Sequence, residues 1–107
     1  MKKVILAGYI DNYDYVHDIT DRDAEHAVHT IVAKLTDKLS SKYKNVSIDA
    51  DDVRWSSCRL CADFYIYNKN KQVDSGTFEF TRYSDYEDED EFQQHLNECI
   101  DKFVAYF

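Results

Sequence analysis

The segment from Ala24 to Leu39 constrains the fold of this chain more than any other. Its apolar residues recur at steps of three and four, which is the spacing of one face of an amphipathic α-helix. Thr20 followed by Asp23 resembles a capping box, so we expect the helix to begin there. A helix with one apolar stripe must bury it against another element, so the chain needs a sheet or a second helix beside it. The stripe consists of Ala24, Ala27, Val28, Ile31, Val32, Leu35 and Leu39.

Three segments after this helix have the alternating pattern of β-strands. The first begins with Val46, Ile48 and Ala50 on one face, and the DADD stretch at residues 49–52 predicts a bulge or turn within it. The NKNK stretch at residues 68–71 is a polar turn between the second and third strands. In the third strand the alternation breaks before Phe78, and Gly76 is the expected site of that irregularity. One face of the second strand carries Leu60, Ala62, Phe64 and Ile66, and the other carries Cys61, Asp63, Tyr65 and Tyr67.

Each end of the chain adds one more predicted element. Residues 2–10 are apolar at both alternating positions, which favours a strand with both faces covered. Near the other end, Ser84 and Glu87 fit a capping box at the start of a second helix. We therefore expect one α+β domain over residues 1–107, in the order β-α-β-β-β-α, with a four-stranded antiparallel sheet and two helices on one face. The second helical stripe is Phe92, Leu96, Cys99, Ile100, Phe103 and Phe107.

Composition narrows the class of partner. The formal charge is −8, from 21 acidic and 13 basic residues, so the chain is expected to avoid nucleic acid and anionic membranes and to be attracted to basic surfaces. Three cysteines, an odd number, fit a reducing cytoplasm. Asp11 ends the first apolar run with no cleavage site after it, and no stretch approaches the roughly 18–20 apolar residues of a membrane span.

The run SDYEDEDEF, at residues 84–92, holds more acids than a helix start needs. Acids in the first turn of a helix each stabilise it by roughly 0.3–1 kcal/mol. Beyond that turn, pairs such as Asp85–Glu89 and Glu87–Glu91 have i,i+4 spacing, and each like-charge pair costs about 0.2–0.5 kcal/mol. Two interpretations stay open: a solvated, solubilising face, or a surface that binds a basic partner.

A second acidic cluster lies before and within the start of the first helix, with tyrosines between the acids of both clusters. Carboxylates present anionic oxygens where a basic groove expects phosphate, and tyrosines add flat contact area that tolerates water. The second cluster is Asp11, Asp14, Asp18, Asp21, Asp23 and Glu25. The predicted partner-binding residues are Asp11, Tyr13, Asp14, Asp18, Tyr83, Asp85, Tyr86, Glu87, Asp88, Glu89, Asp90 and Glu91.

The stretch YEDEDEF, at residues 86–92, is similar to an acidic stretch of the small phage anti-CRISPR proteins that inhibit Cas9. The match covers these seven residues. It implies a compact acidic α/β protein of the host-cell cytoplasm, whose carboxylates occupy the site where Cas9 arginines read the PAM duplex. By motif position those carboxylates would be Glu87, Asp88, Glu89 and Glu91. Charge and size also resemble those of nuclease-inhibitor and nuclease-immunity proteins, which share this strategy without sharing a fold.

A Cys₃His zinc site is the alternative chemistry. The four candidate ligands combine a Cys-x-x-Cys pair with a His-x-x-x-Cys pair on the last helix. Residues three apart on a strand point to opposite faces, and Cys99 falls within the apolar stripe. Reduced structural cysteines and no cofactor are therefore favoured over a metal site. The ligands of the alternative would be Cys58, Cys61, His95 and Cys99.

No enzyme motif assembles: the chain has no Gly-rich phosphate cradle and no nucleophile elbow, and Trp55 is expected to close the edge of the core. The favoured function is a nucleic-acid mimic that blocks the basic site of a nuclease, with a Cas nuclease as the sharpest candidate. The alternative is a non-catalytic adaptor or homodimerising domain, so a monomer and a homodimer both stay open. The sheet face away from the helices is expected to be open to a partner or second subunit, and it carries Asp63, Tyr65, Tyr67, Glu79, Thr81 and Tyr83.

Overall fold

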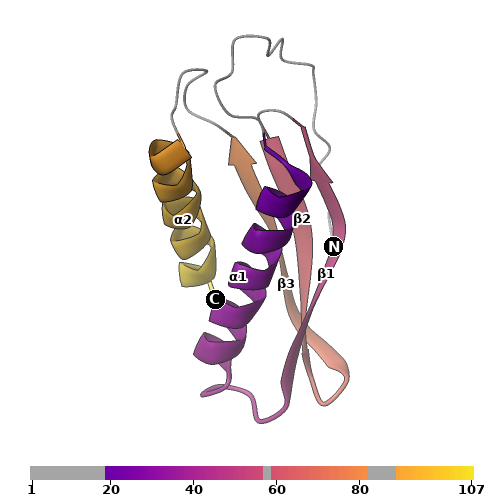
Figure 1. Ribbon diagram of the computed structural model, residues 1–107. Helices are drawn as coiled ribbons and strands as arrows, with labels where there is room; N and C mark the ends of the chain where they lie inside the picture. The colour runs from indigo at the N-terminus through magenta and orange to yellow at the C-terminus, as the bar shows by residue number, and fades with distance from the viewer. Residues whose placement is uncertain (1–18, 57–58, 82–88) are drawn as a thin grey trace.

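The computed structural model describes residues 19–56, 59–81 and 89–107. Their order is α1 (Asp21–Leu39), β1 (Val46–Trp55), β2 (Arg59–Asn68), β3 (Lys71–Thr81) and α2 (Glu89–Ala105). The strands form an antiparallel sheet in the order β1-β2-β3, and both helices cover the same face of it (Figure 1). The α+β class and the single helical layer are thus confirmed.

The predicted four-stranded sheet is wrong, because the sheet has three strands in the described part of the chain. The expected fourth strand, residues 2–10, falls outside the described residues. An apolar run indicates that a segment is to be buried, but it does not specify a hydrogen-bonding neighbour, and a sheet is defined by its neighbours.

The start of α1 has the predicted capping box. The Thr20 hydroxyl accepts a hydrogen bond from the Asp23 backbone N–H at 3.2 Å, and the Asp23 carboxylate accepts one from the Thr20 backbone N–H at 3.0 Å. Two backbone donors that a helix start leaves without partners are thereby satisfied. The apolar stripe is also confirmed, since its members that face the sheet most directly are buried: Ala24, Ala27, Ile31, Leu35 and Leu39.

Irregular backbone occurs at two predicted places. The pairing of β1 with β2 shifts between Asp51 and Arg54, and Asp52 has a φ of 52°, so the DADD stretch does contain a bulge. Lys69 and Asn70 have φ values of 53° and 65°, as the two central residues of a tight β2–β3 hairpin require.

The irregularity predicted at Gly76 is wrong in its position. The register of β2 with β3 shifts between Ile66 and Tyr67, which leaves Val73 as the extra residue of β3. Gly76 pairs regularly with Phe64. Alternation thus revealed that a bulge was present, while the glycine is there for another reason.

That reason is the close approach of two rings to the strand. A Cβ on Gly76 would lie 2.7 Å from Phe107 Cζ and 3.3 Å from the Phe103 ring. Phe103 and Phe107 contact each other edge to face, with their ring centroids 5.3 Å apart. Glycine therefore lets the end of α2 seat its aromatic rings directly on β3.

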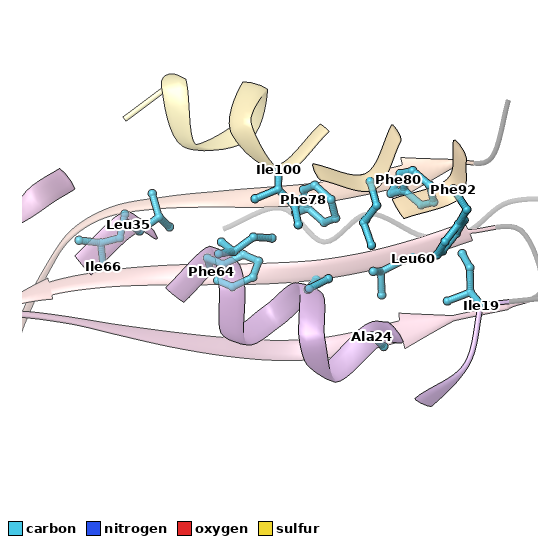
Figure 2. Close-up of a cluster of buried hydrophobic side chains, with 14 of the residues drawn as sticks. Ile19, Ala24, Leu35, Leu60, Phe64, Ile66, Phe78, Phe80, Phe92 and Ile100 are labelled. Carbon is cyan, nitrogen blue, oxygen red and sulfur yellow. The ribbon is translucent and has the colours of Figure 1, made fainter. Parts of the chain in front are cut away.

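The core fills the space between the sheet and the helices (Figure 2). Phe80 of β3 and Phe92 of α2 meet edge to face, with ring centroids 5.6 Å apart. β1 contributes only partly buried side chains, whereas β2 is buried along most of its length. The edge beside β1 is therefore the less completely covered side of the core. The buried core members from β2, β3 and α2 are Leu60, Ala62, Phe64, Ile66, Phe78, Phe80, Phe92, Leu96 and Ile100.

Candidate functional site

The two helices run in the same direction, so both begin at one end of the molecule (Figure 1). The Lys34 ammonium lies 2.6 Å from the Asp101 carboxylate, and the Lys38 ammonium donates to the Val104 carbonyl oxygen at 3.0 Å. Contacts therefore join the second half of α1 to the second half of α2, and they advance along both helices in the same direction, as in a parallel pair. The acidic start of α1 and the acidic start of α2 consequently share an end.

At the start of α1 the acids divide into two roles. Asp23 is partly buried and is committed to the capping box. Asp21 and Glu25 are exposed, and neither forms an ion pair or a hydrogen bond through its carboxylate among the described residues. These two carboxylates are the exposed acids at the start of α1.

At the start of α2 the structure places three of the predicted partner-binding residues. Glu89 is the first residue of the helix, and the side chains of Asp90 and Glu91 are exposed. The predicted cap, Ser84 with Glu87, lies outside the described residues, and so do the other nine predicted partner-binding residues: Asp11, Tyr13, Asp14, Asp18, Tyr83, Asp85, Tyr86, Glu87 and Asp88.

A groove beside Trp55 lies at the same end. It lies between the first turns of α1 and the last residues of β1, with a volume of about 300 Å³, and Asp21, Glu25 and His29 line it together with Val28 and Trp55. Trp55 was expected to close the core edge, but it is 40% exposed and forms part of the groove wall. Sequence carried one signal for this groove, a large aromatic residue at the end of an edge strand.

The outer face of the sheet is less open than predicted. Cys61 and Asp63 lie on this face of β2 and are buried, with 0% and 1% of their surface exposed. One Asp63 carboxylate oxygen, Oδ1, accepts a hydrogen bond from the Thr77 hydroxyl at 2.8 Å. Of the other residues expected on this surface, Glu79 is exposed, Tyr65, Tyr67 and Thr81 are partly buried, and Tyr83 is outside the described residues.

Burial raises the pKa of the Cys61 thiol above its ordinary value. The Arg54 guanidinium opposes this rise in pKa, while the carboxylates of Glu79 and Asp63 add to it. A thiol with a raised pKa carries little thiolate at neutral pH and is a poor nucleophile. Cys61 therefore behaves as a packing residue of the outer face.

The ligands of the alternative zinc site are not brought together. His95 packs against the Phe80 ring at a centroid distance of 4.8 Å on the helix side of the sheet, whereas Cys61 lies on the opposite face. Cys99 is partly buried on α2, and Cys58 lies outside the described residues. In the part of the chain that the structure describes, no three His, Cys, Asp or Glu side chains are placed to hold a metal ion.

The chain was compared with known proteins by sequence and by fold. No family model, no curated protein and no solved structure matches it. The similarity of residues 86–92 to anti-CRISPR proteins therefore stays a prediction. Neither of the two described helices is long and apolar enough to cross a membrane.

Proposed function

We propose that this protein is an acidic, protein-binding inhibitor that mimics nucleic acid and blocks the basic site of a nucleic-acid enzyme. A phage-encoded inhibitor of a CRISPR nuclease is the sharpest form of the proposal, because residues 86–92 resemble that class. The protein performs no chemistry in this role. It occupies a surface that the enzyme needs for its substrate.

One observation carries the proposal: the parallel helices begin at the same end of the molecule, so the acids at their starts lie at that end. Asp21 and Glu25 come from α1, and Asp90 and Glu91 come from α2. Arginine and lysine side chains in a nucleic-acid site are spaced to meet phosphates, and carboxylate oxygens accept the same charge-assisted hydrogen bonds. Acids on two neighbouring helices offer several such acceptors to one basic groove.

The net charge supports the same proposal. A formal charge of −8 on 107 residues attracts a basic enzyme over distances longer than a contact, and the attraction weakens as salt shortens the screening length to about 8–10 Å at moderate ionic strength. Binding to the partner should therefore weaken steeply with salt and should compete with duplex DNA or RNA.

The test uses two double variants that remove the same charge from different places. Asp21→Asn with Asp90→Asn neutralises one exposed acid at the start of each helix. Asp37→Asn with Glu98→Gln neutralises two exposed acids farther along α1 and α2. Immobilised wild-type protein is first used to capture partners from a bacterium that carries CRISPR systems. The captured protein is then purified, and its affinity for each variant is measured with and without duplex DNA.

The expected result is a basic nucleic-acid enzyme that DNA displaces. We expect its affinity to fall about tenfold for the Asp21/Asp90 variant and to change little for the Asp37/Glu98 variant. A partner that ignores DNA and salt, equal effects of the two variants, or recovery of this protein alone would contradict the proposal. The last outcome would favour a homodimerising domain.

A further inference from the structure

The groove beside Trp55 combines three properties that rarely occur together on a solvated surface. Asp21, Glu25 and Val28 recur at steps of four and three along α1, so they follow one another up one side of the helix. Val53 and Trp55, at the end of β1, form the facing wall. The groove thus presents apolar side chains and an exposed indole together with two carboxylates and the His29 imidazole.

The charged side chains of the groove determine which sign of charge an occupant can carry. The Asp21 and Glu25 carboxylates have no cationic partner among the described residues, although they lie beside partly buried apolar side chains. An anionic ligand would be repelled by both acids. A purely apolar ligand would contact the apolar side chains but would leave two carboxylates partly desolvated without compensation.

Its size selects the kind of occupant. At about 300 Å³ the groove is at the lower limit of the range for small-molecule pockets, so it accommodates one long side chain better than a folded ligand. Arginine satisfies all three properties. Its aliphatic stem packs on apolar side chains, its guanidinium stacks on an indole, and its N–H fork donates to carboxylates.

We propose that this groove binds an arginine side chain of a partner protein. The stem of that arginine would lie against Val28 and Val53, with the guanidinium over Trp55 and directed toward Asp21 and Glu25. The class of partner, a basic protein, rests on the proposed function, whereas the preference of the groove for arginine rests on the groove itself. Stacking on Trp55 would hold one arginine in place, whereas the acids at the starts of both helices attract a basic partner over a longer distance.

The test exploits the fact that Trp55 is the only tryptophan in the chain. Its indole N–H gives a single NMR signal that reports on the groove alone. The probe is a capped pentapeptide with one central arginine between glycines. The control peptide carries citrulline, which has nearly the same shape as arginine without the charge.

We expect a saturable shift of the indole signal with the arginine peptide, and binding of the citrulline peptide about tenfold weaker. Glu25→Gln should weaken arginine-peptide binding about threefold, while Glu98→Gln, which removes an equally exposed acid outside the groove, should leave it unchanged. Equal binding of the two peptides would overturn the proposal. So would an unshifted indole, or equal effects of Glu25→Gln and Glu98→Gln.

The outcome is separable from that of the proposed function. The titration requires no nuclease, so arginine binding in the groove stands even if no DNA-displaced partner is found. Conversely, a partner that DNA displaces, together with an indole that ignores arginine, would overturn the groove assignment alone.

Discussion

The two ends of the helical layer use their charges differently. At the end where both helices finish, basic side chains of α1 are engaged by α2. Lys34 pairs with Asp101, and Lys38 donates to the carbonyl oxygens of Val104 and Ala105 in the last turn of α2. Charge at this end holds the fold together.

At the end where both helices begin, the acids do not share one role. Asp23 completes the cap of α1, while Asp21, Glu25 and Asp90 face solvent. A folded chain that needs a particular charge usually gives it a partner, so acids left exposed in a cluster are available to another molecule. Charges that stabilise the fold thus differ from charges available for binding, and the following experiments measure how much individual contacts stabilise each end.

The largest expected effect is at the end where both helices finish, which we call the closed end. Gly76→Val should lower the free energy of unfolding by about 2 kcal/mol, because the added side chain meets the Phe103 and Phe107 rings. Urea denaturation measures this change. The matched control is Ser75→Val, one residue earlier on β3. In a Phe107→Ala background the cost of Gly76→Val should shrink, and an unchanged cost there would show that the ring contact is not its cause.

The second effect is at the acidic end and tests the cap of α1 that Thr20 and Asp23 form. Thr20→Ala removes the hydroxyl that caps α1 and should cost about 1 kcal/mol. Thermal unfolding followed by circular dichroism gives the difference. Thr36→Ala, within the same helix, should cost nothing or slightly stabilise, because alanine is the better helix former. Equal losses from the two variants would remove the special role of the cap.

A smaller effect is expected from the bridge between the helices. Lys34→Met should lower stability by no more than about 0.5 kcal/mol, because the Lys34 and Asp101 side chains are 45% and 63% exposed and water screens their attraction. The loss should disappear in high salt, where an exposed pair is screened further. Lys44→Met, at an exposed position in the α1–β1 connection, is the control. A loss well above 1 kcal/mol would mean that the bridge is a main support of the closed end.

The smallest expected effect concerns Cys61, which lies on the outer face of the sheet and belongs to neither end of the helical layer. The folded state holds the Cys61 proton more tightly than the unfolded chain does, since burial raises the pKa of this thiol. Stability contributed by the protonated thiol is therefore complete below the ordinary thiol pKa of about 8.5 and declines as the pH rises above it. Cys61→Ala should flatten this alkaline decline in urea denaturation at pH 7, 9 and 10, and parallel pH profiles of wild type and variant would contradict the assignment.

Features encoded by a few neighbouring residues were predictable from sequence. The Thr20 cap, the stripe of α1, the bulge in the DADD stretch and the turn at residues 68–71 each depend on residues of a single helix, strand or turn. All four are present in the structure.

Features set by distant residues were not predictable. Alternation predicts a bulge at Gly76, whereas the true need for glycine comes from the Phe107 ring, which lies 31 positions away in the sequence. The sequence predicts Trp55 at the core edge, but the surroundings of its indole depend on the path of α1 along β1, which no residue near Trp55 specifies. The prediction of a four-stranded sheet was wrong for the same reason, since alternation within a segment does not specify which strand pairs with it.

The same division applies to the candidate site. Acidic residues were identified as binding residues from their crowding alone, but no pattern near Asp21 or Asp90 specifies that these two residues share an end of the molecule. That proximity depends on the direction of α2, which the strands between the helices determine.

Whether the number of strands between the helices is odd or even therefore decides which acids lie at the same end of the molecule. Each antiparallel strand reverses the direction of the chain, so three strands after α1 return it to the end where α1 began, and α2 starts there. A meander of two or four strands with equally short connections would start α2 at the opposite pole. The molecule would then carry one acidic helix start at each pole, with an unchanged net charge and no shared surface. An insertion of a whole hairpin preserves the acidic end, whereas gain or loss of a single strand dismantles it without altering one carboxylate.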